Sequence, residues 1–214
     1  YGRRLLETFL AKWPENQKIL VYTENVVMDK HLSQNPRIIT RNLLEVSGHL
    51  RAFKKRHAKN TLAHGFKGPN GISKNYLFDA VRFSHKMFAQ YDAIINPPWD
   101  VKGIVWMDGD TVTHTAVPPN FLTENFPVET KPAGELKKFG IYYLGREHMY
   151  TETGWMIYNR KADQVKEFWE ACIAMYTNDT IFRLEHWTDC HVFDHTRKIF
   201  EKKGLVTVNV TKGF

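Results

Sequence analysis

Two aspartates separated by one glycine are the residues of this sequence best suited to chemistry. The segment GIVWMDGDTVT runs from a short apolar stretch directly into Asp108, Gly109 and Asp110. Two carboxylates this close raise each other's pKa unless a cation lies between them. Mg²⁺ and Mn²⁺ prefer oxygen ligands, commonly one or two carboxylates together with substrate phosphate oxygens. The triplet therefore predicts a divalent metal on Asp108 and Asp110, with Gly109 leaving room for a ligand near the backbone.

Plainer interpretations stay open for the candidate metal ligands. An Asp-X-Asp triplet also occurs by chance in solvated turns that close a strand. His191 and His195 lie four residues apart, a spacing that places two ligand nitrogens on one helix face. The chain has ten histidines and no His-Glu-X-X-His pattern, so an ordinary pair of histidines is the alternative.

The apolar pattern predicts the strands and helices that hold the triplet in place. Short runs rich in branched residues are typical of strands buried on both faces of a parallel sheet. Strands are predicted at 18–22, 37–40, 103–107, 140–144, 154–158 and 205–210. Apolar residues at helical spacing predict helices over 3–13, 43–57, 75–91, 162–176 and 188–202.

Two segments lack such patterns. Residues 59–74 contain three glycines and one proline, and we expect a mobile loop there. Residues 118–138 are rich in proline and polar side chains and predict little regular structure. Strands that alternate with helices favour an α/β fold with a mostly parallel sheet. Ligands of such sheets bind outside the carboxyl ends of the strands, which selects 23–25 and 108–111.

A hydrophobic strand that runs into Asp-X-Asp resembles the metal-binding motif of GT-A fold glycosyltransferases. Segment 18–22, followed by Thr23 and Glu24, is similar to the first nucleotide-binding strand and turn of that fold. The resemblance covers residues 18–195. It implies a single GT-A-like (Rossmann-like) α/β domain over 1–214, with a mostly parallel, mixed central sheet flanked by helices. Residues 1–115 would form the nucleotide-binding half and 116–214 the acceptor and sugar half.

The resemblance also implies roles in binding the donor. The helix DAVRFSHKMFA is similar to the helix before the triplet in that fold, where a basic residue reaches the donor or an adjacent aspartate. Arg82 and Lys86 are the matching candidates, alongside Thr23, Glu24, Asp108 and Gly109. Surface charges on a helix, paired with Asp79, are the alternative for the two basic residues.

Two later segments resemble the sugar pocket and the catalytic region. TETGWMIYN is similar to the strand that lines the sugar pocket in glycogenin-like and related retaining families, which would place Glu152, Thr153 and Gly154 against the sugar. HWTDCHVFD is similar to the acidic segment near the reacting carbon, which makes Asp189 a candidate. A loop carboxylate and a helix cap are the alternatives for Glu152 and Asp189.

The activity implied by the resemblance is transfer of a sugar from a nucleotide-diphosphate sugar, UDP-sugar favoured, to an acceptor hydroxyl with retention. Mn²⁺ or Mg²⁺ would be the cofactor. Glu152 and Asp189 would stabilise an oxocarbenium-like state or activate the acceptor. Many GT-A enzymes have a third metal ligand, often histidine, near the C-terminus, and the ending VNVTKGF has none. His191, His195, water or residues beyond this sequence would have to supply it.

The formal charge of +7 predicts attraction to an anionic partner. Much of the excess lies in LRAFKKRHAKN (50–60), which also suits a solvated helix face. A glycan, a protein or modified DNA is left open as acceptor, and a hydroxymethylated base would have to be exposed by flipping. A basic metal-dependent nuclease or nucleic-acid-binding domain and a non-catalytic sugar-binding module are further alternatives. A nucleotidyltransferase fits less well, because no Gly-rich loop follows the first strand.

Cysteine content and hydropathy bear on location. Cys172 and Cys190 are too few for a disulfide framework and predict free thiols in a reducing, cytoplasmic compartment. No apolar run approaches the roughly 20 residues of a membrane span. The sequence does not begin with Met, so a targeting segment is left open.

Overall fold

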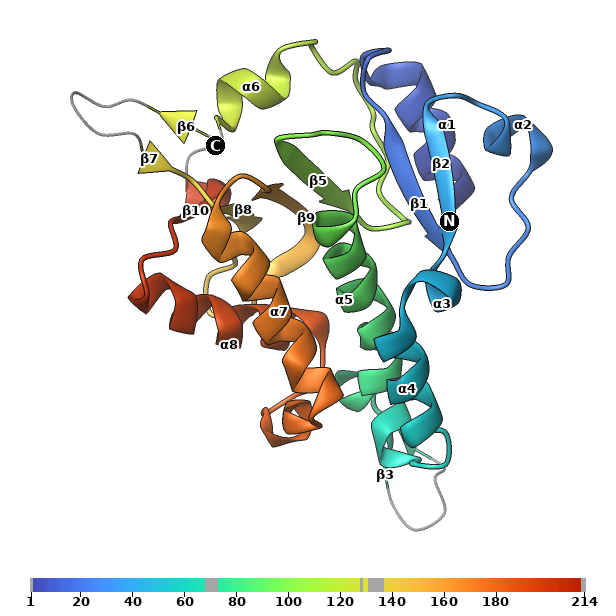
Figure 1. Ribbon diagram of the computed structural model, residues 1–214, viewed down its shortest axis with the longest axis vertical. Coiled ribbons are helices and arrows are strands. Elements are labelled where there is room, and N and C mark those ends of the chain that lie inside the picture. Colours follow the sequence, from blue (N-terminus) through green and yellow to red (C-terminus); the bar gives the residue numbers. More distant parts are fainter. Residues whose placement is uncertain (1, 68–72, 128, 131–136, 213–214) are drawn as a thin grey trace.

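The computed structural model describes residues 2–67, 73–127, 129–130 and 137–212 (Figure 1). Its helices are α1 (Gly2–Lys12), α2 (Lys30–Ser33), α3 (Leu43–Val46), α4 (Gly48–Arg56), α5 (Ala80–Ile95), α6 (Phe121–Asn125), α7 (Asp163–Thr177) and α8 (Asp189–Lys202). Its strands are β1 (Ile19–Thr23), β2 (Ile38–Asn42), β3 (Phe66–Lys67), β4 (Ser73–Lys74), β5 (Gly103–Met107), β6 (Glu129–Thr130), β7 (Lys137–Lys138), β8 (Ile141–Leu144), β9 (Glu152–Asn159) and β10 (Thr207–Asn209). Short 3-10 turns cover Leu62–His64, Tyr76–Phe78, Thr180–Arg183 and Val210–Lys212.

The α/β class and the mixed character of the sheet are confirmed, but the prediction that the sheet is mostly parallel is wrong. β1 and β2 form a parallel pair, and a separate four-stranded sheet has the order β10-β8-β9-β5. β10 and β8 are parallel, whereas β9 is antiparallel to both β8 and β5. An apolar run reports burial, not strand direction, and the antiparallel place of β9 was therefore not visible in its sequence.

The main core lies between the four-stranded sheet and the helices α5, α7 and α8, which gather on one side of it (Figure 1). The largest fully buried side chains include Trp169 and Phe168 of α7, Phe88 of α5 and Phe193 of α8. A smaller cluster of Leu6, Leu32 and Ile38 joins α1 and α2 to the β1–β2 pair.

Two predicted helices are interrupted where polar side chains cap new helix starts. The predicted helix 43–57 divides into α3 and α4 at Ser47, whose extended backbone lets its hydroxyl accept from the Leu50 N–H at 3.2 Å. The predicted helix 75–91 begins as a 3-10 turn, and α5 starts only after Asp79, whose carboxylate accepts from the Arg82 N–H at 3.0 Å.

The two segments predicted to be irregular are described in part. The short helix α6 and the two-residue strands β6 and β7 lie within 118–138, while residues 128 and 131–136 are outside the described residues. The predicted mobile loop 59–74 includes residues 68–72, which are also outside them. Across the described ranges, no helix combines the length and the apolar character needed to cross a bilayer.

Candidate functional site

A lysine on α5 joins the end of β5 to β9 and α8. The Lys86 ammonium lies 2.8 Å from Asp108 Oδ2, 2.8 Å from Asp189 Oδ2 and 3.2 Å from Thr153 Oγ1. Thr153 in turn donates to Asp189 Oδ2 at 2.5 Å. Four of the predicted site residues therefore form one cluster, hereafter the Lys86 cluster: Lys86, Asp108, Thr153 and Asp189.

Antiparallel pairing of β5 with β9 brings two of these residues together. The Asp108 N–H donates to the Gly154 carbonyl at 2.8 Å, so the residue after β5 lies opposite the start of β9. A Cβ on Gly154 would lie 3.3 Å from Asp108 Oδ2 and 3.0 Å from Glu152 Oε1. A side chain at this position would require the carboxylates of Glu152 and Asp108 to shift, because they already occupy the space that it would enter.

The two aspartates of the triplet have different surroundings. Asp108 Oδ1 accepts from the Trp106 indole N–H at 2.8 Å and Oδ2 from Lys86, and the side chain is one-third exposed. Asp110 is exposed and has no polar partner among the described residues. Asp108 to Thr111 form a tight turn, with the Thr111 N–H donating to the Asp108 carbonyl at 2.9 Å.

This donor set fits a hard divalent cation. Each carboxylate oxygen accepts more than one bond, so Asp108 keeps coordinating capacity despite its two hydrogen bonds. Asp110 is open to solvent, where phosphate or water oxygens could complete the coordination. His191 contacts Thr188 and His186, and His195 is exposed; neither has a described contact with Asp108 or Asp110.

Opposite charges decide the ionisation of Lys86. Burial acts to lower the pKa of its ammonium, but the carboxylates of Asp189 and Asp108 outweigh burial and hold the pKa above its usual value. Asp189 is 5% exposed; its charge is compensated by Lys86, and the Thr153 hydroxyl donates a hydrogen bond to it. As the first residue of α8, Asp189 also lies at the positive end of the helix dipole.

A second charged group lies at the end of β1. Glu24 forms ion pairs with Lys54 of α4 and with His85 of α5, the latter at 2.6 Å. Burial acts to raise the pKa of Glu24, but the hydrogen bond from Lys54, which is the largest influence, and the charge of His85 leave it below its usual value. Because His85 is next to Lys86 in the chain, the ends of β1 and β5 face the same part of α5.

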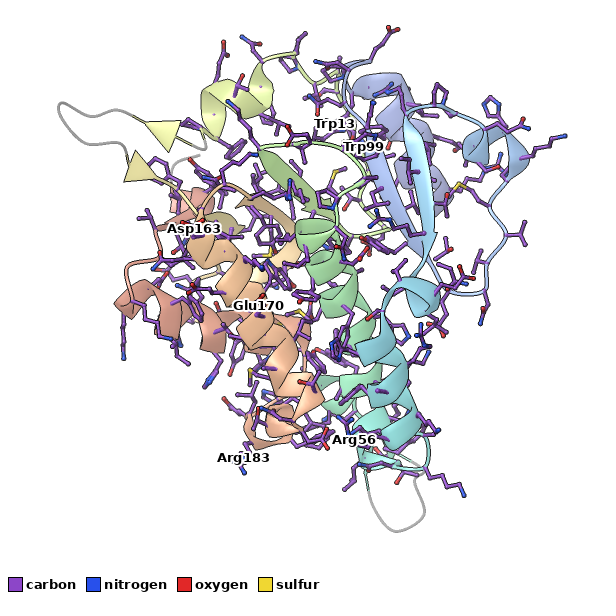
Figure 2. The ribbon with its side chains drawn as sticks, viewed as in Figure 1. Trp13, Arg56, Trp99, Asp163, Glu170 and Arg183 are labelled. Carbon is purple, nitrogen blue, oxygen red and sulfur yellow. The ribbon has the colours of Figure 1, made fainter. Side chains whose placement is uncertain are left out.

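Between β1 and β5 lies a cavity of about 1050 Å³. Thr23, Glu24, Lys86 and Gly109 line it where the two strands end. Trp13 and Trp99, both labelled in Figure 2, also line it. We call this end, formed by Thr23, Glu24, Lys86 and Gly109, the polar mouth of the cavity. The rest of the lining combines apolar residues of the two strands and of α1 with polar residues such as Asn16 and Lys18.

Some predicted residues lie elsewhere. Arg82 is exposed, and its guanidinium stacks near Phe83 rather than reaching Asp108. It does not pair with Asp79 through its side chain, since Asp79 binds Lys74 at 2.8 Å. Glu152 accepts from the Gly154 N–H at 2.9 Å and pairs with Arg146 at 2.8 Å, so it borders the Lys86 cluster without a described contact to Lys86.

Sequence reasoning missed three side chains near the site. The indole N–H of Trp106 donates to Asp108, a contact that the sequence pattern did not predict. Lys54 and His85 were not singled out, and both bind Glu24. The one available signal was the position of His85 beside Lys86, while Lys54 was hidden within a run of basic residues.

The basic run 50–60 is largely used within the molecule. Lys54 pairs with Glu24, and Arg56, at the end of α4 in Figure 2, pairs with Asp179 at 2.7 Å. The Arg51 guanidinium donates to the carbonyls of Leu44 and Glu45. These contacts leave fewer free cations for a nucleic acid than the sequence indicates.

Comparisons with known proteins do not extend this description. No protein-family model matches the sequence, and no curated protein matches it.

Proposed function

We propose that the chain is a metal-dependent glycosyltransferase that uses a nucleotide-diphosphate sugar, with UDP-sugar as the favoured donor. The observation that carries the proposal is the Lys86 cluster, whose lysine lines the polar mouth of the cavity, close in the chain to the exposed Asp110. The carboxylate of Asp108, which we propose binds the metal, the buried carboxylate of Asp189 and the ammonium group of Lys86 come from three separate segments. We also propose that the sugar binds against Glu152, Thr153 and Gly154, and that it is transferred to an acceptor hydroxyl with retention of configuration.

Asp108 and Asp110 would hold Mn²⁺ or Mg²⁺. When bound, the cation supplies positive charge that offsets the negative charge developing on the diphosphate. Thr23 and Glu24, at the end of β1, and Gly109 line the mouth where the donor would lie. Gly154 keeps the approach to Asp108 open because it has no side chain.

Lys86 positions the carboxylates in this proposal. Its ammonium has three donors, and three oxygens lie within 3.2 Å of it. A direct contact with the diphosphate would require one of these bonds to be released. The proposed role of Lys86 is therefore to hold Asp108 and Asp189 at fixed positions, while Asp189 stabilises the oxocarbenium-like state. Glu152 is the proposed second carboxylate of the sugar pocket.

The first test is a thermal-shift series with nucleoside diphosphates, with and without Mn²⁺. A ligand at a hundredfold excess over its Kd stabilises a protein by about 2.7 kcal/mol. We expect stabilisation by one diphosphate, UDP first, only when the metal is present. Equal shifts for all diphosphates without metal would contradict the proposal.

The second test measures metal-stimulated turnover of the nucleotide-sugar. Asp108→Ala and Asp110→Ala should each lower it at least a hundredfold while the fold is retained. The matched control is Asp163→Ala, an exposed aspartate at the start of α7 (Figure 2), which should keep full activity. Undiminished turnover in the Asp108/Asp110 double variant would end the proposal.

A further inference from the structure

We propose a second metal site, for Zn²⁺, on Glu185, His186 and His191. One ligand atom from each residue can be chosen so that all three lie within 4.8 Å of one another. The site is built from the segment before α8 and the first turn of α8. It is separate from the Asp108–Asp110 triplet, because none of its three residues contacts either aspartate in the described chain.

The donor atoms are chemically suited to zinc. Two imidazole nitrogens and one carboxylate oxygen are typical zinc ligands, whereas Mg²⁺ and Mn²⁺ prefer oxygen alone. His186 Nδ1 and His191 Nε2 face each other at 2.9 Å. Two nitrogens at about 2.0–2.1 Å from a tetrahedral zinc lie about 3.3 Å apart. The rings therefore need to separate by only a few tenths of an ångström to admit the ion.

Neighbouring side chains hold the ligands in orientation. The Thr188 hydroxyl lies 2.7 Å from His191 Nδ1, which directs Nε2 of the same ring toward His186. The Tyr150 hydroxyl donates to Glu185 Oε2 at 2.8 Å. Outer partners of this kind fix the tautomer and position of metal ligands. An adjoining hollow of about 300 Å³, lined by Tyr150, Glu185 and His191, leaves space for a water as fourth ligand.

Zinc at this site would fasten the segment that ends at Asp189. Glu185 and His186 precede Asp189, and His191 follows it, so a shared ion closes a loop around that residue. The ion is then a positional support for Asp189 and takes no part in the reaction itself.

The test titrates the purified, metal-free chain with Zn²⁺ and measures stoichiometry and Kd by calorimetry. We expect one tight equivalent, weakened at least a hundredfold in His186→Ala and in His191→Ala. Thr188→Val should weaken binding about tenfold, through loss of orientation. The matched control is His195→Ala, an exposed histidine four residues after His191 in the same helix, which should bind zinc normally.

Adventitious binding is the rival explanation, because the chain has ten histidines. Equal Zn²⁺ affinity in the wild type and the His186/His191 double variant would overturn the proposed site. So would a wild type that binds no equivalent of Zn²⁺ with a Kd below about 10 µM. The titration uses Zn²⁺ alone, and its outcome is therefore independent of the proposed glycosyl transfer.

A different observation carries a second inference: we infer that the gap between β1 and β5 receives an additional parallel strand. The two strands border the cavity described above but do not pair with each other. Their carboxyl ends meet at His85 and Lys86 through Glu24 and Asp108, so they run in the same direction. Both are only partly buried although their residues are mostly apolar.

Within the described residues, the backbone edges of β1 and β5 that face the gap have no hydrogen-bonded partner strand. The Ile19 N–H donates to Arg37 O on the β2 side, and alternation along a strand turns the backbone groups of Leu20 and Tyr22 toward the gap. The Asp108 N–H binds β9, so the groups of Val105 and Met107 face the gap from the other side. A strand placed in the gap would form hydrogen bonds with the backbone groups of both β1 and β5. Buried backbone groups are nearly always hydrogen-bonded.

The position of α1 identifies the occupant as a strand that continues into α1 at Gly2. Gly2 lies at the polar mouth, with its Cα 4.0 Å from a Cβ built on Gly109. From there α1 leads back to the start of β1, as the helix of a β-α-β unit does. Such a strand runs parallel to β1 and ends beside Gly109.

The test adds a six-residue strand of β-branched residues before Gly2 and measures amide hydrogen exchange. The amides of Leu20, Tyr22, Val105 and Met107 should exchange at least tenfold more slowly. The Ile19 and Asp108 amides, which are already paired, serve as internal controls. An equally long extension with alternate prolines is the matched control. No slowing, or equal slowing by the same peptide added as a separate molecule, would overturn the inference.

Discussion

At the scale of single residues, Lys86 is the group on which the candidate site depends. It is the only cation within bonding distance of Asp189 in the described chain, and the Asp189 side chain is 6% exposed. Removing one partner of a buried ion pair leaves the other charge uncompensated, which costs more than the pair itself contributes. The stability of this region and the geometry of the site therefore depend on the same ammonium group.

We expect Lys86→Met to lower the free energy of unfolding by about 3 kcal/mol, because Asp108 and Asp189 lose their shared cation. Chemical denaturation at pH 7 measures this. Turnover should fall as well, since both carboxylates lose their fixed positions. The Lys86→Met/Asp189→Asn double variant should recover part of the stability but no activity. A double variant as unstable as the sum of the single variants would show that the two residues do not interact.

Gly154 gives a second prediction at this scale. Gly154→Ala introduces a Cβ 3.0 Å from Glu152 Oε1 and 3.3 Å from Asp108 Oδ2, so these carboxylates must move. We expect weaker binding of Mn²⁺, by about tenfold, measured by calorimetry. Gly109→Ala is the comparison variant for the effect of an added methyl group, because its Cβ would lie no closer than 4.0 Å to another atom. Unchanged metal affinity in Gly154→Ala would argue against a metal on Asp108.

At the scale of secondary structure, capping residues set where the helices that carry the charged groups begin. Ser47 separates α3 from α4 and directs α4 so that Lys54 reaches Glu24 at the end of β1. We expect Ser47→Ala to cost about 1 kcal/mol of stability, the usual cost of losing an N-cap. Thermal unfolding measures it, and Ser47→Asp should restore most of the loss. Unchanged thermal stability in Ser47→Ala would mean that the cap does not define the start of α4.

The junction between α4 and α7 predicts a dependence on pH. Asp179 follows α7, and burial acts to raise the pKa of its carboxyl, but hydrogen bonds from Arg56 and His57 leave the pKa below its usual value. A lowered folded-state pKa means that the stabilisation is complete above the unfolded value of about 3.9 and is lost as the pH falls through the folded value.

Asp179→Asn should therefore be less stable than the wild type at pH 7, by at most about 1 kcal/mol because the pair is partly exposed. The difference should shrink as the pH is lowered from 5 to 2. Asparagine tolerates the positive φ of 63° at this position, so the backbone is retained. Denaturation of both proteins across this range is the measurement, and a constant difference would contradict the assigned ionisation.

At the scale of the whole molecule, one core joins the elements on both sides of the site. Phe168 of α7 packs against Phe193 and Phe200 of α8 and against Trp169. We expect Phe168→Ala to cost about 3–5 kcal/mol and to shift a single unfolding transition that includes the Lys86 cluster. Circular dichroism and Trp fluorescence, followed together, would test this. Two separate transitions would contradict the prediction of one domain over 1–214.

Several elements and the turn at Asp108 to Asp110 follow from the sequence alone. The strands 19–23 and 103–107 and the helices 163–177 and 189–202 were predicted within a few residues, because periodic burial of apolar side chains is a local property. The position of Asp108 at the end of a strand was also predicted. So was the presence of two unpaired cysteines, Cys172 buried and Cys190 partly buried.

Only the tertiary structure decided which of the candidate residues meet. Arg82 and Lys86 lie one turn apart on the same helix, yet only Lys86 points toward the sheet and reaches Asp108 and Asp189. The antiparallel place of β9, and the choice of His186 over His195 as the neighbour of His191, were likewise absent from any local pattern. The physical reason is that contacts between distant segments depend on how whole elements pack, whereas spacing along the chain reports only which face of each element is buried.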